Sequence, residues 1–143
     1  MPSPPRDTAY SNTPLAKKLG VISTGAEERE IALIAAPDNF IPQLGELPSG
    51  VRFRKSIASN TVLAIIFVRT LAELEHALDM LETKLPPGAS AWIVRPKTHQ
   101  KPGFNENHVR NGGLARGLVD YKICSVDADW SGIKFAWRKS SAQ

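Results

Sequence analysis

Cysteine is almost absent from this chain of 143 residues, in which Cys124 is the only one. A single cysteine excludes an internal disulfide and a metal site built from several thiolates. Because Cys124 lies within the apolar run 121–126, we expect it in the core rather than as a reactive thiol.

Long apolar runs are also missing. No stretch approaches the ~20 apolar residues that a membrane-spanning helix needs. Residues 1–14 lack the apolar centre of a signal peptide. The sequence therefore predicts a cytoplasmic protein without a membrane partner. Histidine is scarce too, and the three histidines show no metal-ligand spacing, so we expect no metal site; they are His76, His99 and His108.

A strong charge of either sign is lacking, since 18 basic and 14 acidic residues leave a net charge of +4. The cations are unevenly spread, however. Six of them, against only Glu106 and Asp120, lie in one stretch: Arg95, Lys97, Lys101, Arg110, Arg116 and Lys122. Such a stretch predicts either a solvated face or a basic surface for nucleic acid.

Apolar patterning predicts an alternation of strands and helices. Continuous apolar runs at 30–36 and 61–68 are typical of strands buried on both faces, whereas alternation at 51–57 indicates an exposed edge strand. Further strands are predicted at 90–94, 121–126 and 132–138. Helices are predicted at 13–20, 39–44, 71–85 and 105–118.

The clearest of these helices is 71–85. Thr70 and Glu73 form the capping-box pattern at its start, and Pro86 ends it. One stripe of leucines runs along it, at Leu71, Leu74, Leu78, Leu81 and Leu85. In the following helix, Gly112 and Gly113 weaken the helix or admit a close neighbour.

The predicted fold class is α/β: a Rossmann-like, mostly parallel sheet with helices on both faces that ends in a C-terminal antiparallel hairpin. The hairpin follows from the short connection 127–131, which cannot accommodate a parallel crossover. Residues 1–12 are rich in proline and polar residues and predict a flexible tail. Residues 13–143 are then expected to form one domain.

Four segments resemble a small bacterial family of unknown function: TPLAKKLG at 13–20, AAPDNF at 35–40, LPPGASAWIVRPK at 85–97 and GLVDYKICSVDADWSGIKF at 117–135. That family is similar in topology to Rossmann-like methyltransferases that use S-adenosylmethionine. The resemblance implies the same fold, with a degenerate cofactor site.

Glycine is missing from the turn after the first expected strand, 35–40. Cofactor-binding turns need glycine because backbone amides must approach the cofactor closely. Pro37 also lacks an amide hydrogen, and Asp38 would repel a pyrophosphate. After the second strand the chain offers Ser56, Ser59 and Asn60 where a ribose-binding carboxylate is expected. No cofactor is therefore predicted.

Ligands of open α/β sheets bind beyond the carboxyl ends of the strands. That rule selects candidate ligand-binding residues after three strands and at the hairpin turn: Asp38, Asn39, Arg69, Thr70, Arg95, Lys97 and Trp130. Arg69, Arg95 and Lys97 would share one rim and hold a phosphate or carboxylate. Alternatively, the arginines form structural ion pairs with Asp38, Asp127 or Asp129, and Trp130 packs on the hairpin or on a partner subunit.

No catalytic set of residues is predicted. The sequence favours a non-catalytic binding or regulatory module for a small anionic ligand or a partner protein. Two alternatives remain open: a divergent adenosylmethionine-dependent methyltransferase, and a nucleic-acid accessory protein. Charged residues on the expected edge strand favour a monomer or a weak dimer.

Overall fold

The computed structural model describes residues 14–22 and 28–138. The expected tail 1–12 and the expected helix cap Thr13 lie outside the described residues. Within them, six strands form one sheet in the order β2-β1-β3-β4-β6-β5. The strand bounds are β1 Arg29–Ile34, β2 Val51–Arg54, β3 Leu63–Phe67, β4 Ser90–Pro96, β5 Leu118–Ser125 and β6 Trp130–Trp137.

The first four strands of the sheet order are parallel, and β6 is antiparallel to both of its neighbours. All five residues of β3 are buried, which explains its unbroken apolar sequence. β2 is an edge strand of alternating exposure, and β5 with β6 forms the C-terminal hairpin. The predicted α/β sheet with its antiparallel end is thus confirmed.

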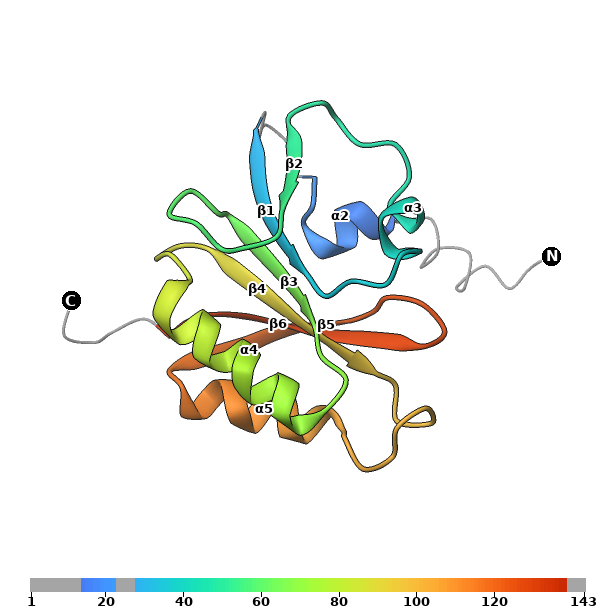
Figure 1. Ribbon diagram of the computed structural model, residues 1–143, viewed down its shortest axis with the longest axis vertical. Helices are drawn as coiled ribbons and strands as arrows, with labels where there is room; N and C mark the ends of the chain where they lie inside the picture. Colours follow the sequence, from blue (N-terminus) through green and yellow to red (C-terminus); the bar gives the residue numbers. More distant parts are fainter. Residues whose placement is uncertain (1–13, 23–27, 139–143) are drawn as a thin grey trace.

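Helices cover both faces of this sheet (Figure 1). Helices α4 (Leu71–Lys84) and α5 (Glu106–Ala115) lie on one face, and the short helices α2 (Leu15–Leu19) and α3 (Phe40–Gln43) lie on the other. Each face has its own apolar core. Side chains of one strand alternate between the two cores, as the two-residue period of a strand requires.

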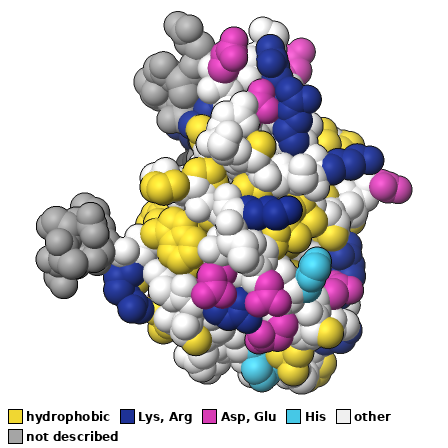
Figure 2. All heavy atoms as spheres, turned by 60° about the vertical axis from the view of Figure 1, so that its left-hand side comes forward, with side chains coloured by type: hydrophobic (Ala, Val, Ile, Leu, Met, Phe, Trp, Pro, Cys, Tyr) yellow, Lys and Arg dark blue, Asp and Glu magenta, His cyan; other side chains and the backbone are white. Residues whose placement is uncertain are grey.

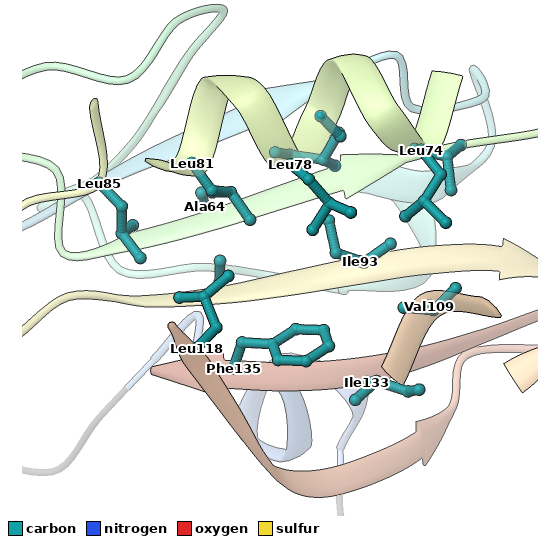
Figure 3. Packing of buried hydrophobic residues seen from close by; sticks show 14 of the residues in the cluster. Ala64, Leu74, Leu78, Leu81, Leu85, Ile93, Val109, Leu118, Ile133 and Phe135 are labelled. Atoms are coloured by element: carbon teal, nitrogen blue, oxygen red, sulfur yellow. The ribbon is translucent and has the colours of Figure 1, made fainter. Parts of the chain in front are cut away.

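Leucines of α4 point into the first core (Figure 3). Leu74, Leu78 and Leu81 pack toward Ile93 and Phe135 of the sheet. The leucine stripe is confirmed except at its first member, because Leu71 is 48% exposed. Its place in the first turn, beyond the carboxyl ends of the strands, leaves it outside the core.

The N-terminus of α4 is capped as predicted, with one difference. Thr70 Oγ1 accepts a hydrogen bond from the Glu73 amide at 3.0 Å. The Glu73 carboxylate accepts from the Arg69 amide, one residue before the expected Thr70 amide, at 2.7 Å. Both groups satisfy amides that the helix itself leaves unpaired.

Several predicted boundaries were wrong by a few residues. Strand β1 ends at Ile34 rather than at residue 36, because Ala35 takes a positive φ of 62°. Helix α5 stops at Ala115, and Leu118 already begins β5. Trp130, expected in the hairpin turn, is the first residue of β6.

No helix joins β2 to β3. Their connection, residues 55–62, is short for two strands that lie on either side of β1. It places Ile57 in the same core as the α4 leucines. The loop thus covers part of a sheet face that a crossover helix usually covers.

Among the described residues, no helix is long and apolar enough to cross a membrane.

Candidate ligand-binding cleft

The turn after β1 has a backbone shape that glycine usually provides. Ala35 has a φ of 62°, the one positive φ outside glycine in the described ranges. Its carbonyl oxygen accepts a hydrogen bond from Arg69 Nη2 at 3.0 Å. The chain therefore makes a sharp left-handed turn here, held from the end of β3.

A polar pocket of about 520 Å³ lies beside this turn at the carboxyl ends of β1 and β2. Asp38 follows β1, and Lys55 directly follows β2. Both side chains line the pocket together with Ile41 and residues 33–37. The pocket therefore has one basic and one acidic side chain on an otherwise apolar wall.

A second pocket, of about 270 Å³, lies between α4 and the ends of β1 and β3. Its wall is almost entirely apolar and includes Ile66, Ala77 and Met80. Ile34 and Ala35 line both pockets, so both hollows border the end of β1. In one view of the surface, hydrophobic side chains gather around a basic group in the middle, and acidic and basic groups lie above and below them (Figure 2).

Arg69 and Trp130, two of the predicted site residues, lie against each other. The Arg69 guanidinium stands 5.0 Å from the centre of the Trp130 ring. That ring in turn meets Phe67 edge-on at a centroid distance of 5.0 Å. Trp130 therefore packs over the carboxyl end of β3, a different contact from the hairpin or partner subunit considered from the sequence.

The hairpin turn before Trp130 is tied to two neighbouring segments. Asp127 accepts a hydrogen bond from Gln43 of α3 at 3.1 Å, and Asp129 accepts one from Gln100 at 2.6 Å. The Lys97 amide donates to the Asp129 carbonyl at 2.8 Å, and Lys97 Nζ donates to Ser125 at 2.7 Å. Lys97 thus binds the hairpin rather than facing the pockets.

Arg95 lies on the opposite face of the sheet from Arg69. Phe67 pairs with Val94, so Arg69 is level with Pro96 and shares its face, while Arg95 points the other way. Its side chain is 7% exposed and lies 3.9 Å from Glu106 of α5. The expected rim of three cations does not form.

The environment of Arg95 is poor in acceptors. Its Nη1 donates to the Pro96 carbonyl at 2.8 Å, but its buried Nε has no partner among the described residues. Burial lowers the pKa of Arg95, and the Glu106 carboxylate opposes this shift. A buried charge with one unpaired donor is costly.

The ion pairs considered for these arginines are also not those observed. In the described part of the chain, neither Arg69 nor Arg95 pairs with Asp38, Asp127 or Asp129. Arg69 instead binds a carbonyl and an aromatic ring, as described above.

The remaining candidates divide between structure and surface. Thr70 is the helix cap of α4, and Asn39 precedes α3 without a capping hydrogen bond from its side chain. Of the seven predicted residues, Asp38 alone lines either pocket described here. Lys55 was missed because the sequence predicts a strand over 51–57 that includes it. The observed β2 ends at Arg54, so Lys55 is the first residue after the strand.

The arginines of the basic stretch 95–122 lie next to acidic side chains. Arg110 bonds Asp120 at 2.9 Å and Glu106 at 2.6 Å. Arg116 contacts three carboxylates of α4, at distances of 2.6 to 3.2 Å. Hydrogen bonds to these acidic partners raise the pKa of both arginines. This stretch therefore does not present its arginines as one free basic surface.

Cys124 is buried with the α2 side of the core, as predicted. Burial raises the pKa of its thiol, while Lys18 and Lys122 act in the opposite direction. Within residues 14–22 and 28–138, no group of three or more histidine, cysteine or acidic side chains is placed to hold a metal ion.

Solved methyltransferases share this fold. A ribosomal protein L11 methylase from Lactobacillus delbrueckii subsp. bulgaricus matches with a TM-score of 0.54 and 10% identity, over 87% of this chain and 77% of that one. A candidate type 11 methyltransferase from Sulfolobus solfataricus matches with a TM-score of 0.55 and 9% identity, over 90% and 92%.

A third similar structure is the geranyl diphosphate C-methyltransferase of Streptomyces coelicolor A3(2), solved with Mg²⁺, geranyl diphosphate and S-adenosyl-L-homocysteine. Its TM-score is 0.55 at 9% identity, over 92% of this chain and 79% of that one. No protein-family model and no curated protein matches the sequence. The chain therefore has a methyltransferase-like fold, and at this identity the likeness extends to the fold alone.

Proposed function

We propose that this chain is a binding module for a small anionic ligand, and that the polar pocket beside Lys55 is its binding site. The observation that carries the proposal is position. The pocket opens at the carboxyl ends of β1 and β2, where open α/β sheets bind their ligands.

The two charged side chains give the pocket a chemical preference. Lys55 supplies an ammonium group for a carboxylate or phosphate, and Asp38 accepts hydrogen bonds from a hydroxyl or amine of the same ligand. Both side chains are exposed, so a ligand can reach them without first breaking an ion pair of the core.

A titration followed by amide NMR tests this proposal. The panel consists of adenosylmethionine, adenosylhomocysteine, nucleotides, inorganic phosphate and small carboxylates. Adenosylhomocysteine belongs in it because a protein of the same fold binds it. Binding should shift the amide signals of residues 35–38 and 55. Saturation at ~100 times the dissociation constant should also raise the melting temperature by roughly 5 to 10 °C.

Two variants give the test its control. Lys55→Ala should weaken the binding of an anion about tenfold, since it removes a charged hydrogen bond. Lys84→Ala removes the same charge from the far end of α4 and should leave the affinity unchanged. Equal affinities of wild type and Lys55→Ala, for an anion that binds, would contradict the proposed site.

A further inference from the structure

The apolar pocket under α4 gives the ligand a second chemical requirement. We infer that the two pockets form one amphipathic site, which takes a small carboxylic acid with an elongated apolar body. The inference rests on the proposed function, because it places the head of that ligand at Lys55.

The shared wall of the two hollows is the first argument. Ile34 and Ala35 belong to the walls of both pockets. The backbone turns sharply at Ala35, and the side chains at this shared wall are the exposed Ala35 methyl group and the partly buried Ile34. A ligand that spans the two pockets would therefore pass over the end of β1 at Ala35, with Ile34 as its bulkiest neighbour there.

The contrast between the walls is the second argument. The pocket under α4 is bounded by aliphatic side chains from β1, β3 and α4, such as Ile34, Ile66 and Met80. Its polar neighbours, Glu73 and His76, stand on α4, and the Glu73 carboxylate is already bonded to the Arg69 amide. Lys55 lines the polar pocket only. The apolar part of a ligand then belongs under α4 and its anionic head at Lys55.

The short connection between β2 and β3 does not fill this space. Ile57 of that loop is buried with the α4 leucines, but it is absent from the wall of the pocket. The apolar wall of an empty hollow is in contact with water, and an apolar group that fills the hollow removes this surface from water, which is favourable.

A series of unbranched carboxylates tests the inference, with affinities measured by calorimetry on the full chain. Butanoate, hexanoate, octanoate and decanoate share one head and differ in chain length. Each methylene that enters the pocket should raise the affinity roughly fourfold until the pocket is full. A flat series in which butanoate still binds would overturn the amphipathic site and leave the proposed function standing. If no member binds, the inference falls, while the nucleotide and phosphate titrations still decide the proposed function.

Substitutions on α4 separate the two pockets. Ala72 lines the apolar pocket on the exposed side of the helix, so Ala72→Phe should abolish the gain with chain length and keep the affinity for butanoate. Met80→Phe narrows the same pocket from another turn of the helix and should have the same effect. It replaces Ala72→Phe in the test if that variant folds poorly. Thr83→Phe, an exposed position outside the pocket, is the matched control and should leave the series unchanged.

A measurement of the oligomeric state distinguishes a small ligand from a protein segment as the occupant of the apolar pocket. If the pocket is instead an interface with a second copy or a partner helix, Ala72→Phe will change the mass measured by light scattering while all carboxylate affinities stay equal. That result would overturn the inference. An unchanged mass together with a lost chain-length dependence would support it.

Discussion

The Arg69 guanidinium stacks 5.0 Å from the centre of the Trp130 ring, at the carboxyl end of β3. The same guanidinium holds the Ala35 carbonyl at 3.0 Å. One side chain thus connects the turn after β1 with the first residue of β6, two segments far apart in the sequence. Arg69, expected from the sequence to bind an anion, instead connects two segments at the carboxyl end of the sheet.

Replacement of Trp130 should therefore reduce stability more than replacement of Arg69. Trp130→Ala removes the contacts with Phe67 and Arg69, and for a half-buried ring we expect a loss of roughly 2 to 3 kcal/mol. Arg69→Met should lower the free energy of unfolding by about 0.5 to 1 kcal/mol. Urea denaturation measures both. Arg69→Met should also weaken ligand binding less than Lys55→Ala does, because it removes a bond to the pocket wall but no charge that lines the pocket; an equal, tenfold loss of affinity would return Arg69 to the binding site.

Arg116 joins α5 to α4 through Glu75, Asp79 and Glu82. These carboxylates are more than half exposed, so each pair contributes less than about 1 kcal/mol. Arg116→Met leaves three acidic side chains close together on one helix, and we expect a total loss of about 1 to 2 kcal/mol. The loss should shrink at high salt, because salt screens exposed charges. A loss independent of salt would show that packing of the arginine stem, not charge, is responsible.

Glu30 should make stability depend on pH in the acid range. A hydrogen bond from Arg54 at 2.8 Å lowers the pKa of Glu30, with Arg52 adding to the effect. A carboxylate with a lowered pKa stabilises the fold above its unfolded pKa, and this contribution disappears as the pH falls through the folded pKa. Stability should thus decline below about pH 4.3 partly because of this group.

Glu30→Gln provides the measurement for that pH dependence. The variant should lose stability at neutral pH and show a flatter curve of unfolding free energy against pH in acid. In an Arg54→Met background the same substitution should change the slope much less, because the main partner is already gone. Parallel wild-type and Glu30→Gln curves throughout the acid range would contradict the assignment.

Arg95 illustrates a stability cost within the core. Its side chain is 7% exposed, its Nε has no partner in the described part of the chain, and Glu106 is 3.9 Å away. Replacing such a group by an apolar side chain of similar length often stabilises a protein. Arg95→Met should therefore maintain or raise the free energy of unfolding, by up to about 2 kcal/mol.

Arg110→Met is the control for Arg95→Met. Arg110 makes close bonds to both Asp120 and Glu106, so its loss should lower stability. If Arg95→Met destabilises the fold as much as Arg110→Met does, the Arg95 environment contains an acceptor that compensates its burial.

The buried strands were predictable because burial on both faces leaves a direct signature. All of β3 and most of β4 are apolar, and no polar residue interrupts the central part of either strand. Gly113 also fits its prediction: a side chain there would collide with the Phe135 ring, which packs directly on α5. Such constraints act on single positions and remain visible in the sequence.

The site was less predictable because it depends on where strands end. Successive side chains of a strand point to opposite faces of the sheet, so an error of one residue in the predicted register moves a side chain to the other face. Arg69 lies just after β3 and Arg95 lies near the end of the neighbouring β4, but the two side chains are on opposite faces of the sheet. Lys55 lines the pocket as the first residue after β2, which ends three residues before the expected end at residue 57. The contact between Arg69 and Trp130 joins segments that are far apart in the sequence, so no local sequence pattern predicts it.

The turn at Ala35 yields the last prediction. An L-residue at a φ of 62° carries a strain of about 1 to 2 kcal/mol that glycine avoids. Ala35→Gly should therefore raise the free energy of unfolding by up to about 1 kcal/mol, the relief of strain being partly offset by the entropy of glycine in the unfolded chain. Ala36→Gly, at the next position without a positive φ, should lower stability instead. If both variants lose stability equally, the left-handed turn is not the conformation of Ala35 in solution, and the corner that joins the two pockets differs from the one described.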